Sequence, residues 1–189
     1  LGWDRTEDDT KALFEDFLGH LRMQNVDVIS RHDDPDIEAF EVALTTIPEF
    51  LRDMFCWEMK WAGKIQREKG EHLISEAILG RIARGEKMTI EDYRLCLNMR
   101  DALRAAFDRV KGKADAFVTL SAQGPAPVGM AVGNPVYGDI SACTAAPAFN
   151  LPLLADRGLP MGIQLLGHAH QDYELALMGR WFEQIFLRG

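Results

Sequence analysis

The sequence predicts an α/β fold in which a helix-rich part, residues 1–111, precedes a strand-rich part, residues 112–189. In the first part, apolar residues recur at helical spacing between residues that commonly cap helices. In the second part, short apolar runs are separated by glycine, proline and aspartate, which is typical of strands and turns. Because few strands accompany many helices, we expect one structural unit with a mixed β-sheet covered by helices.

The composition is that of an ordinary folded protein and limits the partners that we expect. The chain has 189 residues, of which 47% are hydrophobic, enough for a sizeable core. The formal net charge of -8 argues against nucleic acid as a partner, since proteins that bind phosphate backbones carry basic surfaces. No apolar run is long enough to span a membrane, and we expect no membrane partner.

The three cysteines, Cys56, Cys96 and Cys143, are odd in number and widely separated. This spacing predicts neither a disulfide framework nor a zinc site, and we expect no metal and no cofactor. A reducing, cytoplasmic location fits these cysteines best. The chain begins at Leu1 rather than at a methionine and lacks a signal-peptide pattern, as expected for a truncated or processed polypeptide.

The first expected helix begins at Thr6, which forms a capping-box pattern with Asp9, and it ends near Arg22. One side of this helix carries an apolar stripe formed by Leu13, Phe14, Phe17, Leu18 and Leu21. Residues 26–29 then form a short apolar run that predicts a strand.

A polar turn at residues 31–35 leads to a second expected helix, which is capped near Asp36 and which Pro48 breaks or kinks. The aromatic stretch at residues 50–61 is expected in the core, with a border to a pocket or an oligomer interface as the alternative.

Two further helices are expected before residue 111. Residues 71–84 have a weak helical pattern that Gly85 is expected to stop. Thr89 with Asp92 then predicts the capped start of a long helix that runs through Val110.

The second part begins with an expected buried strand at residues 116–120 and a long Gly- and Pro-rich loop at residues 121–138. A loop of this length in a folded domain is functional or mobile. A short helix at residues 140–145 follows, and two strands at residues 148–154 and 162–167 are expected to form a hairpin around Asp156-Arg157-Gly158. A last helix is expected to start at Asp172.

Two segments of this second part carry a specific pattern. The first is Pro147-Ala148-Phe149-Asn150-Leu151-Pro152, and the second is Gly158-Leu159-Pro160-Met161-Gly162-Ile163-Gln164-Leu165-Leu166-Gly167. Together with the preceding DAFVTLSAQGPAPVG segment, they resemble the closing region of the amidase-signature family. The resemblance covers roughly the last third of the chain, and the earlier helices match this family in pattern alone. It implies the C-terminal part of the amidase-signature fold and a hydrolase that cleaves a small-molecule amide.

The resemblance also implies that the catalytic groups lie outside this chain. The family uses a lysine, a bridging serine and a nucleophilic serine near a Gly-Gly-Ser-Ser-Gly-Gly type segment, because a serine hydroxyl needs a positioned base. The serines of this chain are Ser30, Ser75, Ser121 and Ser141, none of them paired, and no Gly-Gly dipeptide occurs. We therefore expect no catalytic residue here, no turnover by the chain alone, and a missing N-terminal part as its partner.

Five residues are candidates for the substrate pocket. Thr119, Ser121 and Gln123 lie at the end of the expected strand and in the loop, while Cys143 and Thr144 lie on the short helix. For Thr119 and Ser121 the alternative is local bonding to turn backbone, and for Cys143 it is burial as a small apolar residue.

Other interpretations stay open at this point. Cys143 with His168 or His170 as base suggests a thiol hydrolase, and the two histidines near Asp172 form a weak metal-site pattern. A non-catalytic binding module of the same fold is another alternative. A third is the catalytic component of a tRNA-dependent amidotransferase, which the acidic balance disfavours. Unpaired sheet edges predict self-association or a homo-oligomer.

Overall fold

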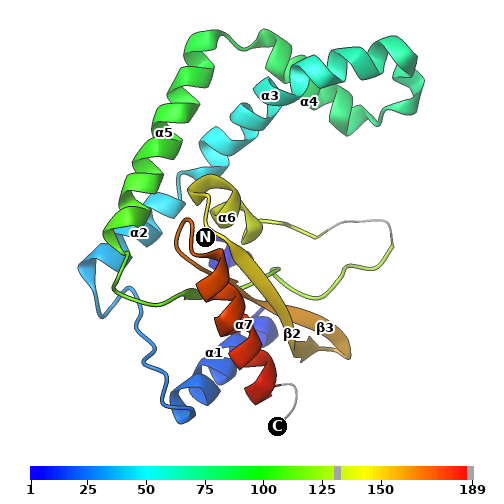
Figure 1. Ribbon diagram of the computed structural model, residues 1–189. Coiled ribbons are helices and arrows are strands. Elements are labelled where there is room, and N and C mark those ends of the chain that lie inside the picture. The colour runs from blue at the N-terminus through cyan, green and yellow to red at the C-terminus, as the bar shows by residue number, and fades with distance from the viewer. Residues whose placement is uncertain (130–132, 187–189) are drawn as a thin grey trace.

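Three strands with helices packed against both of their faces form the centre of the structure (Figure 1). The computed structural model describes residues 1–129 and 133–186. The helices are α1 (Asp8–Met23), α2 (Pro35–Leu44), α3 (Ile47–Gly70), α4 (Glu76–Lys87), α5 (Ile90–Arg109), α6 (Gly138–Thr144) and α7 (Asp172–Phe186), with 3-10 turns η1 (Trp3–Arg5) and η2 (Glu71–Leu73). The strands are β1 (Phe117–Leu120), β2 (Ala148–Asp156) and β3 (Leu159–Leu166). The α/β class expected from the sequence is confirmed.

The sheet has the order β1-β3-β2, and both pairings are antiparallel. The mixed sheet expected from the sequence is therefore antiparallel throughout the described residues. The predicted hairpin is confirmed, since β2 and β3 are joined by Arg157 and Gly158, whose φ values are 51° and 78°. Two consecutive positive φ values are typical of the type I′ turn, one of the two common two-residue hairpin turns.

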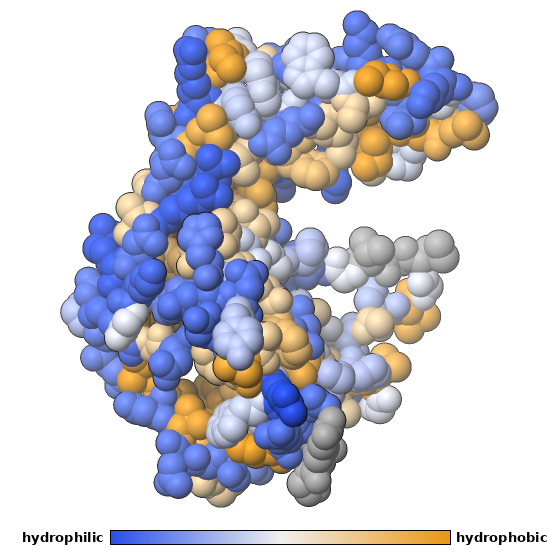
Figure 2. All heavy atoms as spheres, viewed as in Figure 1, coloured by the Kyte–Doolittle hydropathy of each residue, from blue (hydrophilic) through white to orange (hydrophobic). Residues whose placement is uncertain are grey.

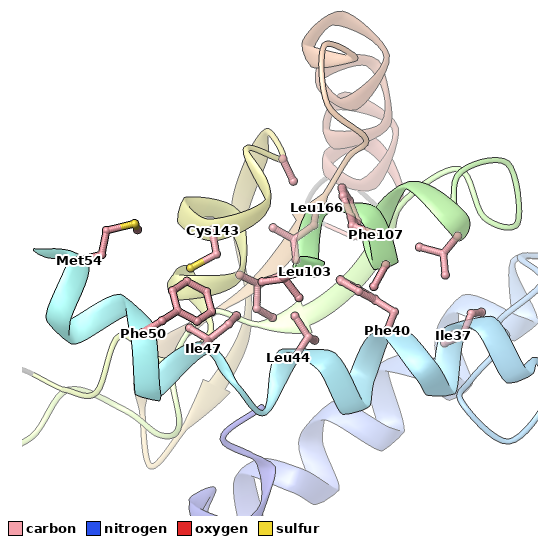
Figure 3. Close-up of a cluster of buried hydrophobic side chains, with 14 of the residues drawn as sticks. Ile37, Phe40, Leu44, Ile47, Phe50, Met54, Leu103, Phe107, Cys143 and Leu166 are labelled. Carbon is pink, nitrogen blue, oxygen red and sulfur yellow. The ribbon is translucent and has the colours of Figure 1, made fainter. Parts of the chain in front are cut away.

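The central strand β3 supplies apolar side chains to two separate clusters. Ile163 and Leu165 belong to a cluster with residues of α1 and α7, whereas Leu166 belongs to a second cluster with residues of α2, α3, α5 and α6. Because successive side chains of a strand point to opposite faces, one strand can serve both clusters. Figure 3 shows the second cluster, in which the labelled side chains converge from α2, α3, α5, α6 and β3.

The start of α1 differs from the expected capping box. α1 begins at Asp8 after Glu7, and no side chain caps it. The Thr6 hydroxyl instead forms a hydrogen bond of 2.9 Å with the Tyr137 hydroxyl, a residue distant in sequence. The capping-box prediction for Thr6 and Asp9 was wrong because a tertiary partner competes for the hydroxyl group.

The strand expected at residues 26–29 is also wrong, because this segment has no strand neighbour and forms an irregular connection. Val26 and Val28 pack against the cluster that contains Ile163, and Ile29 packs against the cluster that contains Leu166. The apolar run thus bridges two parts of the core without joining the sheet.

The break between α2 and α3 was predicted correctly. Asp34 caps α2 by accepting hydrogen bonds from the backbone of Asp36 and Ile37, and Pro48 lies in the first turn of α3. The aromatic stretch at residues 50–61 is buried in part: Phe50 and Met54 are in the core, whereas Phe55 and Trp61 are 43% and 65% exposed.

Gly85 does not stop a helix as the sequence suggested, since α4 continues to Lys87. A Cβ atom on Gly85 would lie 2.0 Å from the backbone oxygen of Cys56 in α3, and one on Gly63 would lie 2.4 Å from the Ile82 side chain. These two glycines therefore let α3 and α4 pack closely. The next helix, α5, begins with the expected capping box of Thr89 and Asp92.

The helices α3, α4 and α5 form an arm that extends away from the sheet (Figure 1). Figure 2 shows open space between this arm and the segment that follows β1. Within the described residues, no helix is both long and apolar enough to cross a lipid bilayer.

The close packing of α3 on α4 predicts opposite effects for two Gly→Ala substitutions on α4. Gly85→Ala should lower the free energy of unfolding by about 1–3 kcal/mol, because its methyl group meets the α3 backbone. Gly80→Ala should raise it by about 0.5–1 kcal/mol, since no atom lies within 4 Å of the new Cβ. Urea unfolding followed by circular dichroism measures both, and equal stability of the two variants would contradict the packing described.

The ion pair that Lys113 forms with two aspartates distant from it in the sequence predicts a pH dependence of stability. The Lys113 ammonium group lies 2.7 Å from Asp34 and 2.6 Å from Asp36. The hydrogen bond from Lys113 holds the pKa of Asp34 below its ordinary value of 3.8, and the hydrogen bonds to Asp34 and Asp36 raise the pKa of Lys113 above 10.5. The stabilisation is therefore complete above pH 3.8 and below pH 10.5.

Lys113→Met should lower the urea midpoint at pH 7, and the difference from the unsubstituted protein should vanish as the pH falls below 3.8 and Asp34 becomes protonated. Lys111→Met is the matched control, because no ion pair of Lys111 is found in residues 1–129 and 133–186. A difference that persists unchanged at about pH 2 would contradict the ion pair as its cause.

Candidate functional site

The candidate site is built on the sheet face that carries Gln164. In the strand register, Gln164 of β3 lies opposite Thr119 of β1 on one side and opposite Asn150 of β2 on the other. These three side chains form a polar row across the sheet, on the face opposite Ile163 and Leu165. A row of neutral hydroxyl and carboxamide groups offers hydrogen-bond donors and acceptors without charge.

Ser121 extends this polar row beyond the end of β1. Its backbone N–H and its hydroxyl group both donate to the Gly162 carbonyl oxygen, each at 3.0 Å. A Cβ atom on Gly162 would lie 2.3 Å from the Ser121 Oγ atom. The glycine therefore leaves the space that the serine hydroxyl occupies.

Gln123 lies two residues further along the loop, and its carboxamide Nε2 donates to the Gly2 carbonyl oxygen at 2.7 Å. The side chain is half-buried. The loop expected at residues 121–138 is confirmed up to residue 129 and from residue 133, and residues 130–132 lie outside the described part.

Cys143 and Thr144 lie in a different environment. Cys143 is 0% exposed and points into the cluster shown in Figure 3, near Phe50 and Leu103. Thr144 is also buried, and its hydroxyl donates to the Ile140 carbonyl oxygen at 2.7 Å. Arg104 of α5 donates to the Cys143 carbonyl oxygen at 2.9 Å, which ties the end of α6 to α5.

Thr119, Ser121 and Gln123 thus lie at the end of β1 and in the loop that follows it, while Cys143 and Thr144 are the last two residues of α6 and are buried in the core. Sequence reasoning missed Gln164 and Asn150 as members of the polar row. The alternation of Gln164 with apolar neighbours in β3 was a signal that it faces away from them.

The thiol alternative is contradicted by the environment of Cys143. Burial raises the pKa of this thiol to about 11, and a reactive thiol requires an exposed thiolate. His168, one of the suggested bases, is itself buried, and its Nε2 atom lies 2.9 Å from the Ala114 carbonyl oxygen. Its ring packs against Phe107 and Phe117.

No group of three or more side chains that could hold a metal ion is found in the described residues. His170, the second histidine of the weak metal pattern, is exposed and has a φ of 66° in the turn before α7.

Three of the four serine hydroxyls donate to acceptors that are neither lysine nor histidine side chains. Ser30 donates to Asp33, Ser121 to Gly162, and Ser141 to the Ala146 carbonyl oxygen. None of the hydrogen bonds found in residues 1–129 and 133–186 joins a serine hydroxyl to a lysine or histidine side chain, although the His32 backbone N–H donates to the Ser30 hydroxyl at 3.2 Å. A serine nucleophile needs such a partner to take its proton.

Two surface hollows lie away from the polar row. One has a volume of about 500 Å³ in the helical arm and is lined by residues that include Phe50, Asp53 and Arg84, the last two joined by an ion pair. The other, of about 460 Å³, lies between α1 and the hairpin turn and is lined by residues that include Asp156 and Arg157. None of the five predicted pocket residues lines either hollow.

Known structures share this fold, although no protein-family model and no curated protein sequence matches the chain. A crystal structure of an amidase superimposes with a TM-score of 0.82 over 96% of this chain and 43% of its own, at 19% identity. Allophanate hydrolase from Kluyveromyces lactis gives a TM-score of 0.67 over 78% of this chain and 26% of its own, at 16% identity.

A bacterial aryl acylamidase of the amidase signature enzyme family gives a TM-score of 0.61 over 75% of this chain and 34% of its own, at 14% identity. These matches confirm that the chain has part of the amidase-signature fold. The chain spans less than half the length of each of these three structures.

The burial of Cys143 predicts that iodoacetamide modifies it very slowly in the native protein. With a pKa of about 11 instead of about 8.5, the thiolate fraction at about pH 7.5 falls by a factor of roughly 100 or more. Mass spectrometry of timed alkylation should show slow reaction of Cys143 in buffer and fast reaction in urea. An exposed control cysteine, introduced by Val128→Cys, should react quickly in both, and equal native rates at both positions would contradict the burial.

Proposed function

We propose that this chain is the C-terminal part of a hydrolase that cleaves a carboxylic amide to an acid and ammonia or an amine. The observation that carries the proposal is the superposition of 96% of the chain on part of an amidase, with a TM-score of 0.82. The amidase-like closing segment from Gly158 to Gly167 contains β3, the central strand of the sheet.

In this proposal the chain supplies part of the substrate pocket. Thr119, Ser121 and Gln123 would line it at the end of β1, and Cys143 and Thr144 would contribute to it from the buried end of α6. The uncharged, half-buried side chains of Thr119, Ser121 and Gln123 support this role, because an uncharged amide is bound well by neutral polar groups that fix its orientation. No metal or cofactor is required for a lysine–serine mechanism.

The catalytic lysine and serines would come from polypeptide that precedes these residues in the whole protein. The contacts of Ser30, Ser121 and Ser141 support this assignment, since Ser121 and Ser141 donate to backbone carbonyl oxygens and Ser30 donates to the exposed Asp33 carboxylate, and within the described part of the chain none of the three is bonded to a lysine side chain. The free edges of β1 and β2 would pair with further strands of that polypeptide, and without them would favour self-association.

We also propose that residues 1–111 and 112–189 act as one structural unit in the cytoplasm. The unit is supported by the ion pair between Lys113 and Asp34 and by the packing of Phe40 against Phe117. The cytoplasmic location is supported by three free, buried cysteines, which are typical of a reducing compartment.

The test of this function is an amidase assay on the purified chain and on the whole protein. With acetamide or benzamide, the chain alone should release ammonia no faster than buffer, because it lacks a serine with a positioned base. The whole protein, produced with its upstream lysine and paired serines, should hydrolyse an amide and lose the activity when the nucleophilic serine is replaced by alanine.

Ser30→Ala serves as a control in both forms, because Ser30 bonds locally to Asp33. Turnover by the chain alone that Ser121→Ala or Ser141→Ala abolishes would overturn the assignment of catalysis to the missing part.

A further inference from the structure

Gln164 is a buried polar residue in the middle of an apolar strand. It is 3% exposed, and the residues on either side of it, Ile163 and Leu165, are fully buried. Burying a carboxamide without hydrogen bonds is costly, so the partners of Gln164 explain why a polar side chain occupies this position.

The carboxamide nitrogen of Gln164 bonds to both ends of one loop. It donates to the Thr119 hydroxyl oxygen at 3.3 Å and to the Tyr137 carbonyl oxygen at 3.0 Å. Thr119 is near the end of β1, and Tyr137 immediately precedes α6. The chain between them is the long loop that contains Ser121 and Gln123.

A second anchor holds the same loop from Gly2 and Thr6, the two residues that flank the N-terminal turn η1. The Tyr137 hydroxyl bonds to Thr6, and Gln123 donates to the Gly2 carbonyl oxygen. Gly2 and Thr6 are themselves joined, because the Thr6 hydroxyl donates to the Gly2 carbonyl oxygen at 3.2 Å. The loop is therefore fixed near its start and at its end by the same two anchors, Gln164 and the residues that flank η1.

We propose that Gln164 is a positioning residue for the amide pocket: its two donated hydrogen bonds fix both ends of the loop and thereby place Thr119, Ser121 and Gln123. The existence of an amide pocket rests on the proposed function. The restraint of the loop by Gln164 does not depend on catalysis. Two N–H donors on one planar group are needed, and a methionine of similar volume has none.

The experiment measures loop motion directly. Val128 lies in the loop and is fully exposed, so Val128→Cys gives a labelling site for a maleimide fluorophore, while Cys56, Cys96 and Cys143 are buried. In this background, Gln164→Met should lower the fluorescence anisotropy of the label. It should also speed amide hydrogen exchange in the loop about tenfold, the effect of losing two hydrogen bonds.

Leu165→Met is the matched control for disturbance of the core. Leu165 is the next residue in β3, is fully buried, and packs in the cluster on the other face of the sheet. A similar change in volume there should lower stability slightly without affecting the anisotropy or the exchange of the loop. Equal effects of both substitutions on the loop would overturn the proposal, because Gln164 would then act through core packing alone.

If Gln164→Met does not fold, a second variant that lacks only one of the two Gln164 hydrogen bonds tests the proposal. Thr119→Val removes the weaker of the two bonds at a half-buried position and should raise loop exchange by a smaller factor. Unchanged exchange in Thr119→Val, together with failure of Gln164→Met to fold, would overturn the proposal.

Binding of benzamide, measured by NMR titration, separates this inference from the proposed function. If the protein binds benzamide, Gln164→Met should weaken binding more than Leu165→Met does, and equal weakening by both variants would count against a positioning role. Absence of binding to the whole protein would count against the amide pocket, while the loop measurements would still decide the role of Gln164.

Discussion

The fold depends on one strand that must satisfy two different environments. β3 pairs with β1 on one side and with β2 on the other, so both remaining strands are held in register by it. Ile163 and Leu165 bury one of its faces against α1 and α7, and Leu166 buries the other near α6. A shift of one residue would exchange these faces and place Gln164 among apolar side chains, so the register is strongly specified.

The same strand connects the core to the candidate site. Gln164 shares a face with Leu166, and it lies beside Thr119 at the end of β1, where the sheet gives way to the loop. Apolar burial thus positions the backbone, and the polar groups on the adjoining part of that face are the ones that we propose for the pocket. A rigid strand beneath a long loop is a common arrangement for a binding surface, because the scaffold limits the loop to few conformations.

The sequence predicts the features that depend on near neighbours. The capping box of Thr89 and Asp92 and the hairpin turn at Arg157 and Gly158 are set by a few adjacent residues, and both are as expected. The roles of Thr6, Gly85 and Gln164 depend on residues far away in the chain, namely Tyr137, Cys56 and Thr119. Local patterns gave a wrong role for Thr6 and for Gly85, and none for Gln164, because each has alternatives that the tertiary structure alone decides.

The strand order has a consequence for how the chain acquires its structure during synthesis. β1 leaves the ribosome before β2 and β3, yet its partner is β3, which is the last of these three described strands in the sequence. Until then β1 has no neighbour to pair with among the described strands, and its apolar residues stay open to wrong contacts. The helices α2 and α5 have already been synthesised by that time. Their side chains Phe40 and Phe107, which pack against Phe117 of β1, can bury Phe117 while translation continues.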